Sequence, residues 1–139
     1  MKVISTTNAP EAIGPYSQAY AAGGMLYISG QIPVVPENNT IPNGIEAQAE
    51  QSCMNVGAIL KAAGVDFKNV VKTTCFLADI NDFSKFNSIY EKYFISRPAR
   101  SCVAVKDLPK GVLCEMEAIA VTEDKEQSCQ KEKYRFEIN

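Results

Sequence analysis

The sequence contains no histidine among its 139 residues. This absence excludes Ser-His and Cys-His nucleophilic catalysis, histidine acid–base chemistry and the usual histidine metal sites. Any catalysis by this chain must therefore use carboxylates, arginine, lysine, tyrosine, cysteine or backbone groups.

The chain also lacks the pattern of a disulfide framework or of a structural zinc site. Its five cysteines are an odd number, and no two of them form a CxxC pair. They are Cys53, Cys75, Cys102, Cys114 and Cys129. Cys53 and Cys75 fall on apolar positions, so we interpret them as core residues.

Long apolar runs are missing as well. No stretch approaches the ~20 apolar residues that span a bilayer, and residues 1–20 do not resemble a signal peptide. We therefore expect a cytosolic protein without a membrane partner.

The charges show no excess of either sign. The 14 basic and 16 acidic residues are spread along the chain and give a net charge of −2. Because no basic stripe appears, binding to nucleic acid is not expected. The length fits one domain, and a hydrophobic fraction of 46% provides a core.

Short runs of β-branched and aromatic residues predict strands. The predicted strands are 2–5, 17–22, 25–29, 70–78, 100–106 and 112–122. The Gly23-Gly24 pair predicts a two-residue hairpin, and the proline-containing segment 31–44 predicts a loop. A second turn is expected at 108–111.

Two amphipathic helices are predicted between the strands. Apolar residues recur at spacings of three and four over residues 44–63, and Gly64 ends this helix. The second helix follows a turn at 79–82 and ends before Pro98. Its apolar face carries Phe83, Phe86, Tyr90 and Phe94.

This order predicts an α+β fold with both helices on one face of a single mixed sheet. The other sheet face would then be exposed and half apolar, and copies of the same chain are the simplest cover for it. We therefore expect a homo-oligomer. The charged segment 123–133 is predicted to be mobile, whereas 134–138 alternates enough to dock on a sheet edge.

Arg100 is the first candidate for a functional residue, because it begins a strand whose next residues are uncharged. It is either a solvated surface residue or an anion-binding group. The planar guanidinium fork can bind a carboxylate through two hydrogen bonds, which a lysine cannot imitate.

Glu115 and Glu117 are the second candidates. Strand alternation places both carboxylates on one sheet face, with Met116 and Ala118 on the other. They are either solvated or hold a water near Arg100. If the strands of Arg100 and Glu115 pair as a hairpin, the two side chains could approach each other.

Four further residues are weaker candidates. Cys102 lies two residues after Arg100 on the same strand face, where it could line the same pocket. A role as a nucleophile is not indicated, because no base is apparent that would activate its thiol. Ser29-Gly30 ends a strand where a ligand could approach closely. Tyr16 follows a Gly-Pro turn and either presents its ring to a ligand or packs in the core.

Nine short segments resemble, in order, those of the RidA/YjgF family of 2-imino acid deaminases, over roughly residues 3–122. They are NAP at 8–10, IGPYSQ at 13–18, ISGQIP at 28–33, VKTT at 71–74, NDF at 81–83, NxxY at 87–90, RPARSCV at 97–103, LPKG at 108–111 and EMEAIA at 115–120. The resemblance implies a chorismate-mutase-like single domain at 1–122, with 123–139 as a C-terminal extension. It also implies a homotrimer with ligand sites between subunits.

The resemblance also implies residue roles. Arg100 matches the family arginine that binds the substrate carboxylate, and Glu115, rather than Glu117, matches the glutamate that positions a water. The matching pocket-lining positions are Tyr16, Ser29, Gly30, Asn87 and Cys102. The implied reaction is hydrolysis of a 2-imino acid to a 2-keto acid and ammonia, without a metal or organic cofactor.

Fold does not determine function, so other activities stay open at this point. The alternatives are a regulatory trimer that binds small carboxylates without turnover, an endoribonuclease or translation inhibitor, and a structural module. The connection 95–97 is also shorter than in familiar bacterial members, which leaves the pocket shape and the preferred imine undetermined.

Overall fold

A computed structural model describes residues 1–122 of the chain. The strands are β1 (Lys2–Ile4), β2 (Ala19–Ala22), β3 (Met25–Gln31), β4 (Val70–Leu77), β5 (Ala99–Ala104) and β6 (Cys114–Val121). The helices are α1 (Ile45–Ala62) and α2 (Phe83–Tyr93). Every predicted strand and helix is present, with ends that differ by a few residues; β3, for example, continues to Gln31.

Local chemistry explains the predicted turns. The hairpin between β2 and β3 passes through Gly23 and Gly24, whose φ angles of 58° and 77° lie in the left-handed region that glycine adopts without a steric cost. Gly64, with φ of 80°, follows the last turn of α1 in the same way.

The sheet has six strands in the order β1-β2-β3-β6-β4-β5. All neighbours are antiparallel except β4 and β5, which are parallel and are connected through α2. The hairpin considered for the strands of Arg100 and Glu115 is therefore wrong, because β4 lies between β5 and β6. A helix connects parallel neighbours naturally, and α2 returns the chain to the outer side of β4.

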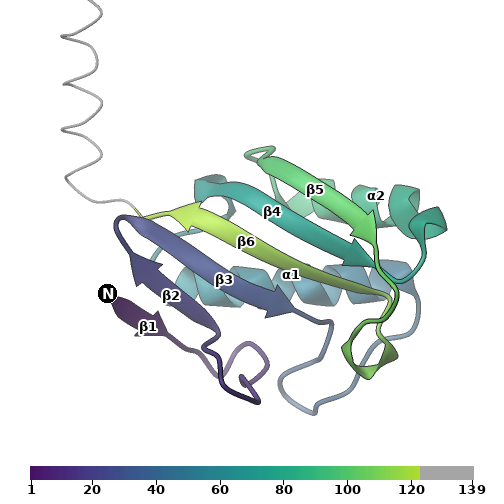
Figure 1. Cartoon of the computed structure of the whole chain (residues 1–139), viewed down its shortest axis with the longest axis horizontal. Coiled ribbons are helices and arrows are strands. Elements are labelled where there is room, and N and C mark those ends of the chain that lie inside the picture. The colour runs from purple at the N-terminus through teal and green to yellow at the C-terminus, as the bar shows by residue number, and fades with distance from the viewer. Residues whose placement is uncertain (123–139) are drawn as a thin grey trace, which may run out of the picture.

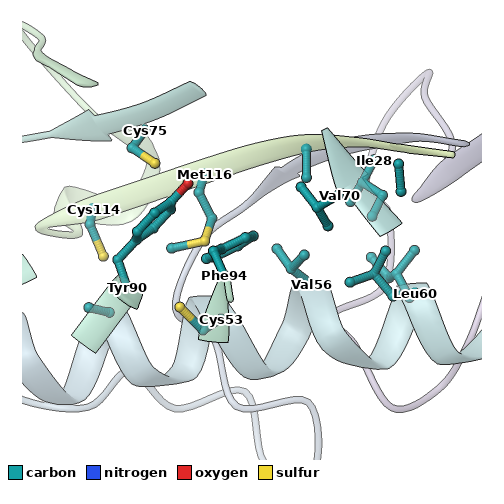
Figure 2. Packing of buried hydrophobic residues seen from close by; sticks show 14 of the residues in the cluster. Ile28, Cys53, Val56, Leu60, Val70, Cys75, Tyr90, Phe94, Cys114 and Met116 are labelled. Carbon is teal, nitrogen blue, oxygen red and sulfur yellow. The ribbon is translucent and has the colours of Figure 1, made fainter. Parts of the chain in front are cut away.

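Both helices cover the same face of the sheet (Figure 1), as predicted for this α+β fold. The core fills the space between the two helices and the sheet. Alternate β6 residues point into it, and Met116 lies close to Tyr90 of α2 and to Phe94, the residue that follows α2 (Figure 2). Cys53 and Cys75 are completely buried there, which confirms their interpretation as core residues.

The other face of the sheet is uncovered in a single chain (Figure 1). Its aromatic and aliphatic side chains remain accessible, including Tyr27 at 47% and Val103 at 46% exposure. This open face has the half-apolar character that motivated the expectation of a homo-oligomer. The oligomer itself stays a prediction.

The C-terminal extension 123–139 lies outside the described residues, and with it the predicted mobility of 123–133 and the predicted docking of 134–138. Within residues 1–122, neither helix combines the length and the apolar character that crossing a membrane requires.

Candidate active site

Arg100 lies on the edge strand β5 and contacts three side chains of α2. Its Nη1 donates a hydrogen bond to Asn87 Oδ1 at 2.8 Å. Its Cζ lies 4.7 Å from the centre of the Tyr90 ring and 5.5 Å from that of Phe83. The spacing 83, 87, 90 places these residues on one face of the helix, so α2 surrounds the guanidinium with neutral groups.

The sheet register shows on which side Arg100 lies. Its partner on β4 is Thr73, which is buried and shares a hydrogen bond of 2.7 Å with the Tyr90 hydroxyl. Arg100 therefore points to the helix-covered side. Within residues 1–122 the single ion pair joins Lys68 and Asp66, so no described carboxylate neutralises Arg100. Its charge is available to an anion from outside the described chain.

Cys102 follows Arg100 on the same side of β5, as predicted, and pairs with the core residue Cys75 on β4. Burial raises the pKa of the Cys102 thiol, and the nearby Arg100 opposes this shift only in part. The thiol is therefore protonated near neutral pH, which argues for a lining role rather than a nucleophilic one.

Glu115 points to the opposite, open face of the sheet. Alternation along β6 places Cys114 and Met116 in the core and Glu115 with Glu117 on the open side, as predicted. Burial raises the pKa of the Glu115 carboxyl, and the like charge of Glu117 raises it further. Glu115 thus holds its proton more readily than an ordinary glutamate.

Gly30 provides the space that Glu115 occupies. The register between β3 and β6 shifts between Ile28 and Gln31, and Gly30 lies in this irregular stretch. A Cβ atom on Gly30 would lie only 3.0 Å from Cδ of Glu115 and still closer to its carboxylate oxygen. No side chain larger than hydrogen fits there while Glu115 keeps this position.

Ser29 and Tyr16 lie near the same end of β3. The Ser29 hydroxyl donates a hydrogen bond to the carbonyl oxygen of Ser17, and both residues line a furrow on the open face that also includes Glu117. Tyr16 is 53% exposed and lines an adjoining cavity of about 750 Å³, which shares Ser17 with the furrow.

The predicted site residues thus form two groups. Arg100, Asn87 and Cys102 belong to the helix-covered edge, whereas Ser29, Gly30, Glu115 and Tyr16 lie at or beside the open face. Arg100 on β5 and Glu115 on β6 are separated by β4, so their two strands lie about 10 Å apart across the sheet. Their side chains also point to opposite faces. One chain therefore does not bring them together.

Sequence reasoning missed part of the surroundings of Arg100. The sequence patterns place Phe83 and Tyr90 on the apolar face of a helix and assign no role to Thr73. In the structure Phe83 is 39% exposed and faces the arginine. The spacing of Phe83 and Tyr90 around Asn87 was the available signal, but periodicity alone does not identify what a helix face contacts.

Comparisons with known proteins show to which family the chain is similar. The sequence model of the endoribonuclease L-PSP family matches residues 6–122. A 2-iminobutanoate/2-iminopropanoate deaminase of Mus musculus is 55% identical, covering 86% of this chain and 90% of the mouse protein. The RutC family protein PM1466 of Pasteurella multocida is also 55% identical, covering 86% of this chain and 97% of that protein.

Among solved structures, E. coli TdcF with bound serine superimposes with a TM-score of 0.85 at 46% identity, covering 88% of this chain and all of the TdcF chain. The chain belongs to the endoribonuclease L-PSP family, which confirms its resemblance to the RidA/YjgF proteins.

Proposed function

We propose that this chain hydrolyses small 2-imino acids to 2-keto acids and ammonia. The observation that carries the proposal is Arg100, a guanidinium held by neutral side chains with no described carboxylate to neutralise it. A small carboxylate is the anion that such a planar fork binds best. The deaminase names of relatives at 52–55% identity support the same reaction.

We further propose that each site forms between two copies of the chain in a homotrimer. Arg100 and Glu115 point to opposite sides of one sheet, so a shared site needs the Arg100 edge of one copy beside the open face of the next. Placing a second copy there would also cover the exposed apolar side chains of the open face.

In this site the arginine of one copy would bind the substrate carboxylate. Its Nη1 is already directed at Asn87, which leaves the remaining N–H groups for the ligand. Binding at this end fixes the imine carbon relative to the facing copy and makes the attack effectively intramolecular.

Glu115 of the facing copy would hold the attacking water and accept its proton. The water oxygen bonds to the imine carbon while the proton taken up by Glu115 passes to the imine nitrogen, which gives a tetrahedral 2-amino-2-hydroxy acid. Glu115 then accepts the hydroxyl proton and delivers it to the amino group, the C–N bond breaks, and the carbonyl forms as ammonia leaves. These steps use side chains and water alone.

The other predicted residues have supporting roles in the proposal. Asn87 orients Arg100, Cys102 lines the carboxylate end, and Gly30 leaves room for Glu115. Ser29 and Tyr16 would line the open-face end, where Tyr16 contacts the substrate side chain.

The test measures hydrolysis of 2-iminobutanoate and 2-iminopropanoate formed in situ by a dehydratase or an amino acid oxidase, with semicarbazide trapping the imine that survives. Wild type should lower the trapped imine, whereas Glu115→Gln should lose about 100-fold or more of this effect because its amide cannot accept the proton. Wild type that performs no better than buffer would refute the proposal.

The pH dependence of hydrolysis should follow Glu115. A base must be ionised, so activity should fall as the pH drops through the raised pKa of Glu115. Glu117→Gln removes the like charge that adds to this shift, so the acid limb of the pH–rate profile should move to lower pH. High salt should reduce the difference between the two proteins, because Glu117 is exposed. An acid limb at the same pH in both proteins would contradict the role of Glu115.

Gly30→Ala should reduce hydrolysis at least tenfold, roughly the effect expected for a displaced catalytic group. The new methyl group occupies the position of the Glu115 carboxylate, so the glutamate must move away. Gly64→Ala is the matched control, because its Cβ meets no atom but its φ of +80° strains the backbone. The control should lose about 1 kcal/mol of stability and keep its activity when folded. Equal activity of both variants would show that Gly30 has no special role.

The alternative proposal is a protein that binds small carboxylates without turnover. The serine in the E. coli TdcF structure is such a ligand, bound to a family member. Binding of 2-oxobutanoate without imine hydrolysis would favour this alternative. The family description also names an endoribonuclease, and RNA cleavage that persists in pure Arg100→Ala protein would favour that activity instead.

A further inference from the structure

We propose that Tyr90 is a positioning residue, whose ring serves as the support on which the Arg100 guanidinium is oriented for a ligand carboxylate. The inference rests on the proposed function, in which Arg100 binds that carboxylate. It adds a residue to the site that contacts the arginine and that no predicted role includes.

The contact itself is the first argument. The guanidinium carbon lies 4.7 Å from the centre of the Tyr90 ring, closer than to Phe83 at 5.5 Å. A cation over an aromatic face is attracted by the ring quadrupole. Together with the hydrogen bond to Asn87 Oδ1, this contact holds the arginine from two directions and limits its rotamers.

The Tyr90 ring is itself immobilised, which a support requires. It stacks on Phe94 with ring centres 4.3 Å apart and contacts Phe86 at 5.9 Å. Its hydroxyl is held by Thr73, the residue that pairs with Arg100 across β4 and β5. Figure 2 shows Tyr90 in the core, beside Phe94 and beneath the sheet. Thr73 thus contacts both the strand that carries Arg100 and the Tyr90 ring, and it fixes the position of one relative to the other.

The support is also electrically neutral. Burial raises the pKa of the Tyr90 hydroxyl to about 12, so the phenol stays protonated near neutral pH. A glutamate or aspartate at this position would orient Arg100 equally well, but it would compete with the ligand for the charge. An aromatic ring orients the guanidinium and leaves its hydrogen-bonding edge and most of its charge to the substrate.

The test measures the dissociation constant of 2-oxobutanoate, the keto acid product, by calorimetry or NMR on the assembled full-length protein. Tyr90→Leu removes the ring and should weaken binding about tenfold. Tyr90→Phe keeps the ring and should restore binding to within about threefold of wild type. Arg100→Ala should abolish binding, and its signal serves as the background of the binding measurement.

Tyr93→Leu is the matched control on the same helix. Tyr93 donates a hydrogen bond to Glu50 and packs on Phe67, away from Arg100. Its loss also disturbs the packing of α2, although Tyr93 is less buried than Tyr90, so it should lower the melting temperature and leave the dissociation constant unchanged.

Each outcome separates this proposal from the proposed function. Wild-type affinity in correctly assembled Tyr90→Leu, or equal weakening in Tyr93→Leu, overturns the role of Tyr90. Wild type that binds 2-oxobutanoate but hydrolyses no imine overturns the proposed reaction, while the comparison of the variants still decides the role of Tyr90. Wild type that neither binds 2-oxobutanoate nor hydrolyses an imine overturns both.

Discussion

Arg100→Ala is expected to reduce imine hydrolysis to the rate in buffer. Removing one partner of a desolvated, hydrogen-bonded charge pair costs about 2–5 kcal/mol, which corresponds to roughly 30-fold to several thousandfold. The effect should lie in the upper part of this range, because no other described cation contacts Asn87, Tyr90 or Phe83 to replace the guanidinium. Semicarbazide trapping and 2-oxobutanoate binding should both report the loss.

Arg100→Lys should restore little of this activity. An ammonium group cannot donate to Asn87 and bind both carboxylate oxygens in one plane, and it lies less favourably on the Tyr90 ring. Arg97→Gln, a change at an exposed arginine three residues earlier, is the matched control and should retain wild-type activity. Near-normal hydrolysis by assembled Arg100→Ala would refute the carboxylate-binding role.

Mixing two inactive variants should restore activity. If each site takes Arg100 from one copy and Glu115 from the next, a trimer that contains both Arg100→Ala and Glu115→Ala subunits has one intact site among its three interfaces. The other interfaces lack one or both residues. Hydrolysis by trimers that contain both variants should therefore rise from the background of either variant alone to about a third of the wild-type rate.

The mixture requires oligomers that contain both variants, obtained by co-expression with two different tags and purification on both. A mixture of Arg100→Ala with the double variant Arg100→Ala/Glu115→Ala is the control, because no interface can then combine an arginine with a glutamate. Mixed oligomers that stay inactive would show that the two residues do not act across an interface.

Much of the fold follows from local patterns that act within a few residues. The Gly23-Gly24 pair predicted the β2–β3 hairpin because the turn requires positive φ angles at both positions. Alternation along 114–121 predicted that Glu115 and Glu117 share one face while Met116 is buried. Arg100 stood out as a charged residue at the start of an otherwise uncharged strand.

The order of the strands did not follow from such patterns. Alternation indicates which side chains share a face, but it does not identify the neighbouring strand. The suggested pairing of the strands of Arg100 and Glu115 was wrong because α2 connects β4 to β5 in parallel and β6 inserts between β3 and β4. Long-range packing on the helices, rather than any local signal, places β6 in the centre of the sheet.

The sequence alone thus determined the chemistry available to this protein: no histidine, one arginine suited to a small carboxylate and a glutamate on a sheet face. The tertiary structure decided where these groups lie. It placed Arg100 on the Tyr90 ring on the helix-covered side, and it placed Glu115 over Gly30 on the open side. The physical reason is that residue type and spacing specify the local conformation and the face of an element on which a side chain lies. Proximity between residues that are distant in the sequence depends instead on how the whole chain packs its core.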